Sequence, residues 1–132
     1  MKKIAVIVLM LLSIIIPVKA FAAEQYSTLN LEQTLEEEGI KAKFENYKET
    51  DDQITIYLFR GKGCAYCRKF LEFLNGITEE YGKYFKLVSF ETWYNEENSN
   101  LLSEISTFMN EPASGVPYII IGDKVFGGYT ES

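Results

Sequence analysis

Histidine is absent from this sequence of 132 residues, and cysteine, proline and tryptophan are scarce. Without histidine, the chain forms neither a Ser-His nor a Cys-His catalytic pair, and no unperturbed side chain titrates near neutral pH. Only Cys64 and Cys67 remain as soft nucleophiles or metal ligands. A zinc site needs about four ligands, so zinc binding would require two chains to share their cysteine pairs. We therefore expect no metal.

Positive charge is also in short supply. The chain has 13 Lys and Arg against 19 Asp and Glu, a net charge of -6, and no run of five or more like charges. Electrostatic capture of nucleic acid is therefore disfavoured. The longest acidic run, Glu36 to Glu38, is expected to be the solvated face of a short helix. A hydrophobic fraction of 47% at this length is typical of one domain with a packed core.

The first 22 residues have the organisation of a bacterial secretory signal peptide. Lys2 and Lys3 precede an apolar run over 4–16, Pro17 follows it, and small residues at alternate positions occur in 20–22. As a helix that apolar run is about 20 Å long, shorter than the ~30 Å hydrocarbon core of a bilayer. We expect cleavage after residue 22 and export. An uncleaved membrane anchor is the alternative.

Cleavage at that point would leave an acidic exported domain. Loss of residues 1–22 removes three lysines and no acid, which brings the net charge to -9. In the oxidising surroundings of the periplasm, the cell envelope or the extracellular medium, a cysteine pair is more often a disulfide than a zinc site. We expect residues 23–43 to form a helix and a strand that lead into the main domain, residues 44–132.

Local patterns predict the first elements. Asn30 and Gln33 have the spacing of a capping box for a short helix that Gly39 ends. Alternating apolar and charged residues over 40–45 predict a half-buried strand. The apolar run over 54–59, rich in β-branched and aromatic residues, predicts a central strand covered on both faces.

Helices and strands alternate along the rest of the chain. Apolar residues at helical spacing predict one helix that begins at the cysteine pair and another over 101–109, ended by Asn-Glu-Pro. Residues 85–91 predict a strand, and 118–126 a hairpin with a Gly-Asp turn. A right-handed crossover would make the strand at 85 parallel to the strand at 54. The order is that of an α/β protein, with the cysteines at the carboxyl end of the sheet.

The two cysteines occupy different environments in this arrangement. Cys64 lies at the start of a helix, where unpaired N–H groups and the helix dipole favour a thiolate. Cys67 lies one turn later on the apolar face, so its thiol should be less exposed and less ionised. Three basic side chains lie nearby in the sequence: Lys62, Arg68 and Lys69. This asymmetry indicates that Cys64 forms a mixed disulfide with a partner and that Cys67 resolves it.

A purely structural bridge is the alternative for the cysteine pair. Because a disulfide that encloses two residues constrains the unfolded chain weakly, it is a poor stabilising device. A Cys-x-x-Cys sequence at a strand-to-helix junction therefore favours a redox-active pair.

From about residue 44 to residue 129 the chain resembles the thioredoxin-like superfamily. The resemblance rests on Cys64-Ala65-Tyr66-Cys67 after an apolar strand, Gly115-Val116-Pro117 after the next helix, and Gly127-Gly128 after the hairpin. It implies a three-layer α/β fold with a central mixed sheet. It further implies that Pro117 is cis and faces the cysteines, and that the backbone of Val116 pairs with an extended substrate segment, with Ala65 and Tyr66 as further contacts. An ordinary trans proline opening an edge strand is the alternative.

Some positions depart from thioredoxins proper. Gly63 replaces the usual Trp before the first cysteine, Ala-Tyr replaces Gly-Pro between the cysteines, and Leu58 occupies the place of a buried acid that assists proton transfer. Tyr66 and the glycine pair are more similar to glutaredoxins, whose glycine pair borders a glutathione site. The acidic pair that often follows there is replaced by Tyr-Thr-Glu at 129–131.

The end of the sequence is a further departure. The family closes with a helix after the glycine pair, whereas this sequence stops at Ser132. We favour a fragment over the alternative that another protein surface covers these strands, which would be an aggregation liability if exposed.

Two aromatic residues, Trp93 and Tyr94, follow the strand at 85–91. They lie at the same end of the predicted sheet as the cysteines. They either pack at the strand end or form an aromatic rim for a substrate groove.

The resemblance implies an exported thiol-disulfide oxidoreductase, acting as oxidase, reductase or isomerase on cysteine-containing exported proteins. A redox partner would recycle the pair. We expect no cofactor and no nucleic-acid partner, and membrane association only if the signal peptide stays uncleaved. The alternatives are a redox-inactive binding or assembly module on the same fold and a glutaredoxin-like, glutathione-dependent reductase.

Overall fold

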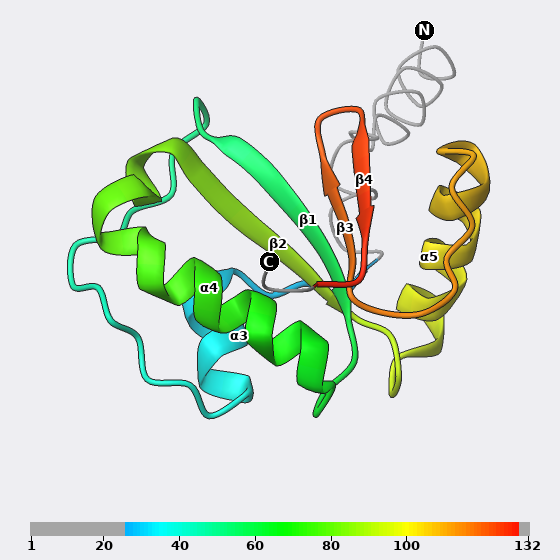
Figure 1. Ribbon diagram of the computed structural model, residues 1–132, viewed down its shortest axis with the longest axis horizontal. Helices are drawn as coiled ribbons and strands as arrows, with labels where there is room; N and C mark the ends of the chain where they lie inside the picture. Colours follow the sequence, from blue (N-terminus) through cyan, green and yellow to red (C-terminus); the bar gives the residue numbers. More distant parts are fainter. Residues whose placement is uncertain (1–25, 130–132) are drawn as a thin grey trace, which may run out of the picture.

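A four-stranded mixed sheet organises the molecule in the computed structural model, which describes residues 26–129 (Figure 1). The elements, in chain order, are α3 (Leu31–Glu37), β1 (Ile54–Arg60), α4 (Ala65–Tyr81), a short 3-10 helix (Gly82–Tyr84), β2 (Phe85–Glu91), α5 (Glu96–Phe108), β3 (Tyr118–Ile121) and β4 (Lys124–Gly127). The predicted signal peptide and the last three residues lie outside the described range. Within residues 26–129, no helix is long and apolar enough to cross a membrane.

The strand order in the sheet is β2-β1-β3-β4. β1 pairs in parallel with β2, from Ile54 opposite Phe85 to Arg60 opposite Glu91, as the crossover rule predicts. β1 is antiparallel to β3, which forms a hairpin with β4. The predictions of a central β1, a strand at 85–91 and a C-terminal hairpin are confirmed.

Helices cover both faces of the sheet, so the domain has three layers (Figure 1). The core on the α3 and α4 side includes these buried residues: Leu31, Leu35, Ile56, Leu58, Phe70, Leu71, Leu74, Leu87 and Ile119. The core on the α5 side is smaller and aromatic: Phe59, Phe90, Leu102, Tyr118 and Ile120. Phe59 stacks on Phe90 with ring centroids 4.6 Å apart.

Coverage of β1 on both faces is incomplete, which corrects the sequence prediction. Leu58 and Phe59 are fully buried, but Ile54 is 58% exposed and Tyr57 is 41% exposed. Ile54 begins the strand, at the edge of the α3 and α4 layer. Tyr57 precedes Phe59 on the α5 side, where the core is gathered around Phe59 and Phe90.

The α3 helix forms as its sequence predicts. Asn30 accepts a hydrogen bond from the Gln33 N–H at 2.9 Å, and the Gln33 side chain accepts one from the Asn30 N–H at 3.0 Å. Gly39 follows with a φ of 67°, a conformation that glycine adopts without strain.

The predicted strand over 40–45 is wrong, because this segment is irregular. A buried side chain of α4 takes the hydrogen bonds that a neighbouring strand would have made. Asn75 Oδ1 accepts from the Lys43 N–H at 2.9 Å, and Asn75 Nδ2 donates to the Lys41 carbonyl oxygen at 2.9 Å. The alternating pattern survives only in part, since Phe44 is buried and Ala42 is exposed.

The resulting architecture is an α/β fold with a central mixed sheet. It is compatible with a thioredoxin-like fold, and within residues 26–129 no helix follows β4. Because β1 and β2 run in parallel, their carboxyl ends share one edge of the sheet, and the segment with the cysteines leaves β1 there.

Candidate functional site at the cysteine pair

A tight turn carries the chain from β1 into α4. The Cys64 N–H donates to the Gly61 carbonyl oxygen at 3.0 Å. Gly63 has a φ of 84°, which disfavours any residue with a Cβ. The turn brings Cys64 to the carboxyl edge of the sheet within four residues of the strand end.

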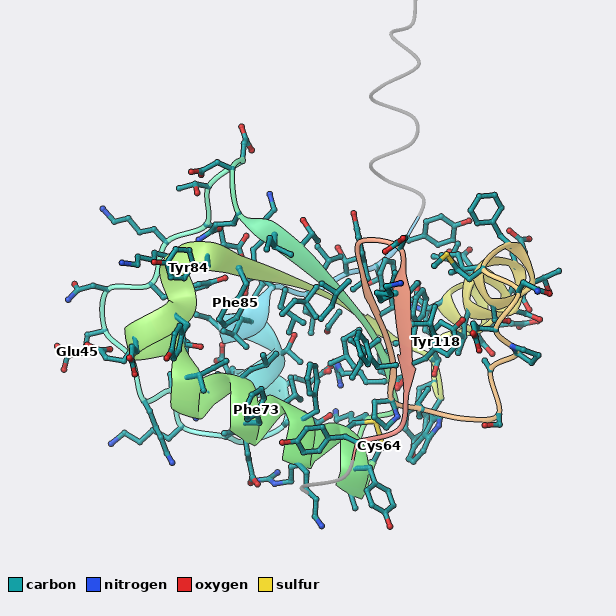
Figure 2. The ribbon with its side chains drawn as sticks, turned by 45° about the horizontal axis from the view of Figure 1, so that its top comes forward. Glu45, Cys64, Phe73, Tyr84, Phe85 and Tyr118 are labelled. Carbon is teal, nitrogen blue, oxygen red and sulfur yellow. A yellow bond between two sulfur atoms is a disulfide. The ribbon has the colours of Figure 1, made fainter. Side chains whose placement is uncertain are left out.

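Cys64 and Cys67 form a disulfide at the start of α4, next to the chain that leads into β3 (Figure 2). Their Cα atoms are 5.2 Å apart. Cys64 is the N-cap of α4, and its Sγ accepts a hydrogen bond from the Cys67 N–H at 3.2 Å. The sulfur therefore occupies the position where the helix start favours a negative charge.

Both cysteines are buried in the structure. Cys64 is 5% exposed and Cys67 is 1% exposed, so the expected asymmetry is present but small. The intervening Ala65 and Tyr66 are exposed, the Tyr66 ring by 56%.

The loop before β3 lies against the first cysteine. The Val116 carbonyl oxygen is 3.8 Å from Cys64 Sγ. The Val116–Pro117 peptide bond is cis, and Pro117 is buried. The Gly128 N–H donates to the Pro117 carbonyl oxygen at 2.9 Å, which ties the glycine pair to the same loop. The structure thus brings together the three segments on which the family resemblance rests.

Trp93 packs over the turn that precedes the cysteines. A Cβ built on Gly61 would lie 2.1 Å from Trp93 Cδ2, so the indole ring occupies the space that a side chain would need. The Glu91 carboxylate accepts from the Lys62 N–H at 3.0 Å and from the Trp93 N–H at 3.2 Å. Trp93 therefore packs over the turn while 55% of its surface stays exposed, and Tyr94 projects beside it with 82% of its surface exposed, so both alternatives, packing at the strand end and an aromatic rim, remain open.

A buried cation lies beneath this turn. Arg60, the last residue of β1, is fully buried, and its guanidinium forms ion pairs with Glu37 and Glu38. Its Nε donates to Ser89 Oγ at 3.2 Å. A buried guanidinium is stable only with such partners, because burial removes its hydration. Glu38 also reaches the turn, since its Oε2 accepts from the Gly63 N–H at 3.4 Å.

This ion pair corrects the prediction that the acidic run is a solvated helix face. Glu36 is exposed, but the side chain of Glu38 is only 6% exposed and that of Glu37 is 33% exposed. The sequence pattern indicates no role for Arg60. The available signal was its register, because Arg60 is in phase with the inward-facing Ile56 and Leu58.

Two of the three basic side chains near the cysteines are engaged elsewhere. Arg68 donates to the Glu38 carbonyl oxygen at 2.7 Å and to Glu72 at 3.3 Å. The Lys69 ammonium lies over the Tyr66 ring, 5.6 Å from its centroid. The start of α4, rather than these cations, is therefore the principal feature that stabilises an anion at Cys64.

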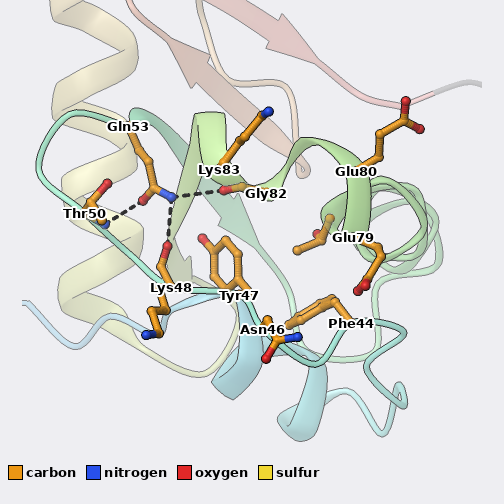
Figure 3. A pocket seen from close by; sticks show the side chains of 11 residues that line it. Phe44, Asn46, Tyr47, Lys48, Thr50, Gln53, Glu79, Glu80, Gly82 and Lys83 are labelled. Atoms are coloured by element: carbon orange, nitrogen blue, oxygen red, sulfur yellow. Dashed lines mark hydrogen bonds between the residues drawn. The ribbon is translucent and has the colours of Figure 1, made fainter.

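A cavity of about 300 Å³ lies at the opposite, amino end of β1 (Figure 3). The Gln53 side chain accepts from the Thr50 N–H at 2.8 Å and donates to the carbonyl oxygens of Lys48 and Gly82 at 2.9 and 3.0 Å. The Tyr47 hydroxyl donates to the Phe85 carbonyl oxygen at 3.0 Å. These groups hold the loop before β1 in place.

Metal-ligating side chains do not gather in the described part of the chain, where no group of three or more of them is found.

No family model matches this sequence, and no curated protein and no solved structure matches it either.

Proposed function

We propose that this chain is an exported thiol-disulfide oxidoreductase that exchanges disulfides with cysteine-containing exported proteins. The observation that carries the proposal is the position of Cys64 Sγ at the N-cap of α4, where it accepts the Cys67 N–H. A thiolate formed there is stabilised by the helix start, and a stabilised thiolate is a good leaving group. A bridge that only braced the fold would gain little from this placement.

In the oxidising direction, a partner thiolate attacks Cys64 Sγ. The Cys64–Cys67 bond breaks, its electron pair departs on Cys67, and a mixed disulfide joins Cys64 to the partner. A second partner thiolate then attacks the partner sulfur, and Cys64 leaves as a thiolate at the helix start. The partner has lost two electrons, the cysteine pair has gained them, and the two thiol protons have moved through solvent. A disulfide-bearing redox partner reverses these steps to restore the pair.

In the reducing direction, the Cys64 thiolate attacks a partner disulfide and releases one partner thiolate. Cys67, buried one turn along α4, then attacks Cys64 Sγ as a thiolate and releases the second partner thiolate. Leu58 is fully buried, and by the resemblance it occupies the place of the acid that assists this proton transfer in thioredoxins, so we expect the Cys67 proton to pass to water or to the departing partner thiolate.

The partner segment is proposed to lie along the loop before β3. Val116 is partly exposed, and its carbonyl oxygen is 3.8 Å from Cys64 Sγ, so an extended chain paired with this loop would carry its own cysteine close to Cys64. The exposed Ala65 and Tyr66 flank the same sulfur. The export of the protein, and hence the class of partner, rests on the N-terminal sequence.

Trapping of the mixed disulfide tests the proposal. We expect Cys67→Ser to accumulate a covalent complex with an unfolded, disulfide-bearing substrate protein, because its Cys64 thiolate opens the substrate disulfide and the resolving thiol is gone. The matched control, Cys64→Ser, should form much less, because Cys67 does not occupy the N-cap position that favours a thiolate and is only 1% exposed. Non-reducing electrophoresis and mass spectrometry identify the adduct and the cysteine that carries it.

Two outcomes contradict the proposal. Equal trapping by both variants would contradict the assignment of Cys64 as the attacking cysteine and Cys67 as the resolving cysteine. If the Cys64–Cys67 bridge instead resists reduction throughout graded dithiothreitol buffers, the binding or assembly module on the same fold becomes the better interpretation.

A glutaredoxin-like activity is the second candidate, favoured by the hydrogen bond from Gly128 to Pro117. This bond places the glycine pair beside a cavity of about 320 Å³ that Gly115 and Val116 also line. If the cavity accepts glutathione, the protein should release glutathione from a glutathionylated peptide in a Cys64-dependent reaction. The absence of turnover in a coupled glutathione assay removes this candidate.

A further inference from the structure

The C-terminal turn of α3 is connected to the cysteine turn through one carboxylate. Glu38 pairs with the buried Arg60 guanidinium at 2.7 Å, and its other oxygen accepts from the Gly63 N–H at 3.4 Å. The carbonyl oxygen of Glu38 accepts from Arg68 in the first turn of α4 at 2.7 Å. A single residue thus contacts the chain on both sides of the cysteine pair.

We propose that Glu38 is a positioning residue that sets the redox potential of the Cys64–Cys67 pair, held in place by Arg60. The inference rests on the proposed function and deepens it, because it names the group that opposes the thiolate at Cys64. No position within the Cys-x-x-Cys sequence supplies such a group.

The sign of the effect follows from the geometry. Gly63 precedes Cys64, so the Glu38 carboxylate lies on the order of 10 Å or less from the Cys64 sulfur. With 6% of its side chain exposed, Glu38 is weakly screened by salt. Its negative charge makes a thiolate at Cys64 less favourable and offsets part of the stabilisation by the helix start. A less stable thiolate favours the disulfide and makes the pair more reducing.

The ion pair with Arg60 stabilises the buried carboxylate of Glu38. The Arg60 guanidinium also pairs with Glu37, so two carboxylates surround one cation. Only Glu38 of the two accepts a hydrogen bond from the cysteine turn. Glu37 therefore provides a matched control that changes the same ion pair without changing the contact with Gly63.

The test measures the equilibrium between the full-length protein and glutathione in three variants. Glu38→Gln keeps the size of the side chain and an oxygen for the Gly63 N–H, but it removes the charge. We expect its constant for disulfide formation to fall about tenfold, equivalent to a potential higher by ~30 mV. For Glu38→Asp, whose carboxylate is withdrawn from the turn, the constant for disulfide formation should fall about threefold. For Glu37→Gln, the same constant should stay within about twofold of the wild-type value.

A second measurement separates an electrostatic effect from a loss of structure. The pH profile of alkylation of the reduced pair should move to lower pH in Glu38→Gln, because the Cys64 thiolate forms more readily. A residue with a purely structural role would lower the stability without moving this profile. If Glu38→Gln does not fold, the smaller shift in the alkylation pH profile that we expect for Glu38→Asp tests the proposal.

The outcomes distinguish this inference from the proposed function. If the wild-type pair does not exchange with glutathione or dithiothreitol, the proposed function and the inference about Glu38 are both contradicted. If the wild-type pair exchanges and the Glu38 variants match it, only the inference is overturned. Equal shifts in Glu37→Gln and Glu38→Gln would also overturn it, because the contact with Gly63 would then have no effect of its own.

Discussion

Single buried polar residues hold the irregular segment between α3 and β1. Asn75 is 2% exposed and bonds to the backbone on both sides of Ala42. Gln53, 7% exposed, bonds to three backbone groups around the start of β1. Buried backbone groups without such partners would cost about 1–3 kcal/mol each. These side chains replace the sheet ladder that the segment does not have.

The partly buried hydroxyl of Tyr47 makes the stability of the protein depend on pH in the alkaline range. Burial, together with the nearby charges of Glu49 and Glu32, raises the pKa of Tyr47 to about 12 from its usual value of 10. The unfolded chain therefore loses this proton at lower pH than the folded protein does. The contribution of Tyr47 to stability is full below pH 10 and is lost as the pH rises from about 10 to about 12.

Tyr47→Phe should reduce the loss of stability in that alkaline window. At neutral pH the variant should be less stable by about 1 kcal/mol, because the hydroxyl bond to the Phe85 carbonyl oxygen is gone. Urea unfolding at several pH values between 8 and 12 checks both effects. Burial also raises the pKa of Tyr118, so part of the alkaline loss should remain. Parallel pH curves for wild type and variant would contradict the assignment.

At the scale of elements, α4 determines the chemistry of the site. It begins at Cys64, buries Cys67, Phe70, Leu71 and Leu74 against the sheet, and runs to Tyr81. Its exposed face carries Gly76, an unfavourable residue within a helix. The stability of the helix start, where we propose that a thiolate forms, depends on this buried face.

Gly76→Ala should stabilise the protein by ~0.5–1 kcal/mol, because alanine restricts the unfolded chain and suits a helix. A Cβ there would meet no atom within 4 Å. Gly39→Ala is the matched control: its site is equally open, but its φ of 67° is unfavourable for alanine. That variant should lose about 1 kcal/mol. Urea midpoints with unchanged m-values measure both changes, and shifts of the same sign would refute the argument.

At the scale of the whole molecule, the two edges of the sheet differ from its centre. β1 pairs with β2 along its whole length and with β3 on its other side, whereas β4 pairs only with β3. β4 is largely exposed, including Phe126 at 50%. The free energy needed to expose amides should therefore be highest in β1 and lowest in β4.

Hydrogen exchange followed by mass spectrometry measures this order directly. We expect peptides from β1 to exchange only on global unfolding and peptides from β4 to exchange through local opening at much lower free energy. Peptides from β2, bonded to β1 and to Leu29 through a single bridge, should be intermediate. Equal protection of β1 and β4 would show that the hairpin and the central strands open as one unit.

Most elements were predictable because their signals are local. The capping box of Asn30 and Gln33, the apolar run of β1, the Gly-Asp turn of the hairpin and the helical spacing after Cys67 each depend on neighbours within a few residues. The strand predicted over 40–45 was wrong because its pattern is also satisfied by an irregular segment bonded to Asn75, 32 residues or more away. Periodicity describes which faces are apolar, not which groups complete the hydrogen bonds.

Residue spacing alone implies the α/β order and the position of a cysteine pair at the start of a helix. The surroundings of that pair depend on contacts between distant segments. The contact of Val116 with Cys64, the indole of Trp93 over Gly61, and the bond from Gly63 to Glu38 all join segments at least 25 residues apart. Charge and packing across such distances depend on which strands are neighbours in the sheet. In that arrangement, part of an acidic run predicted to be a solvated helix face pairs with a buried arginine beneath the site.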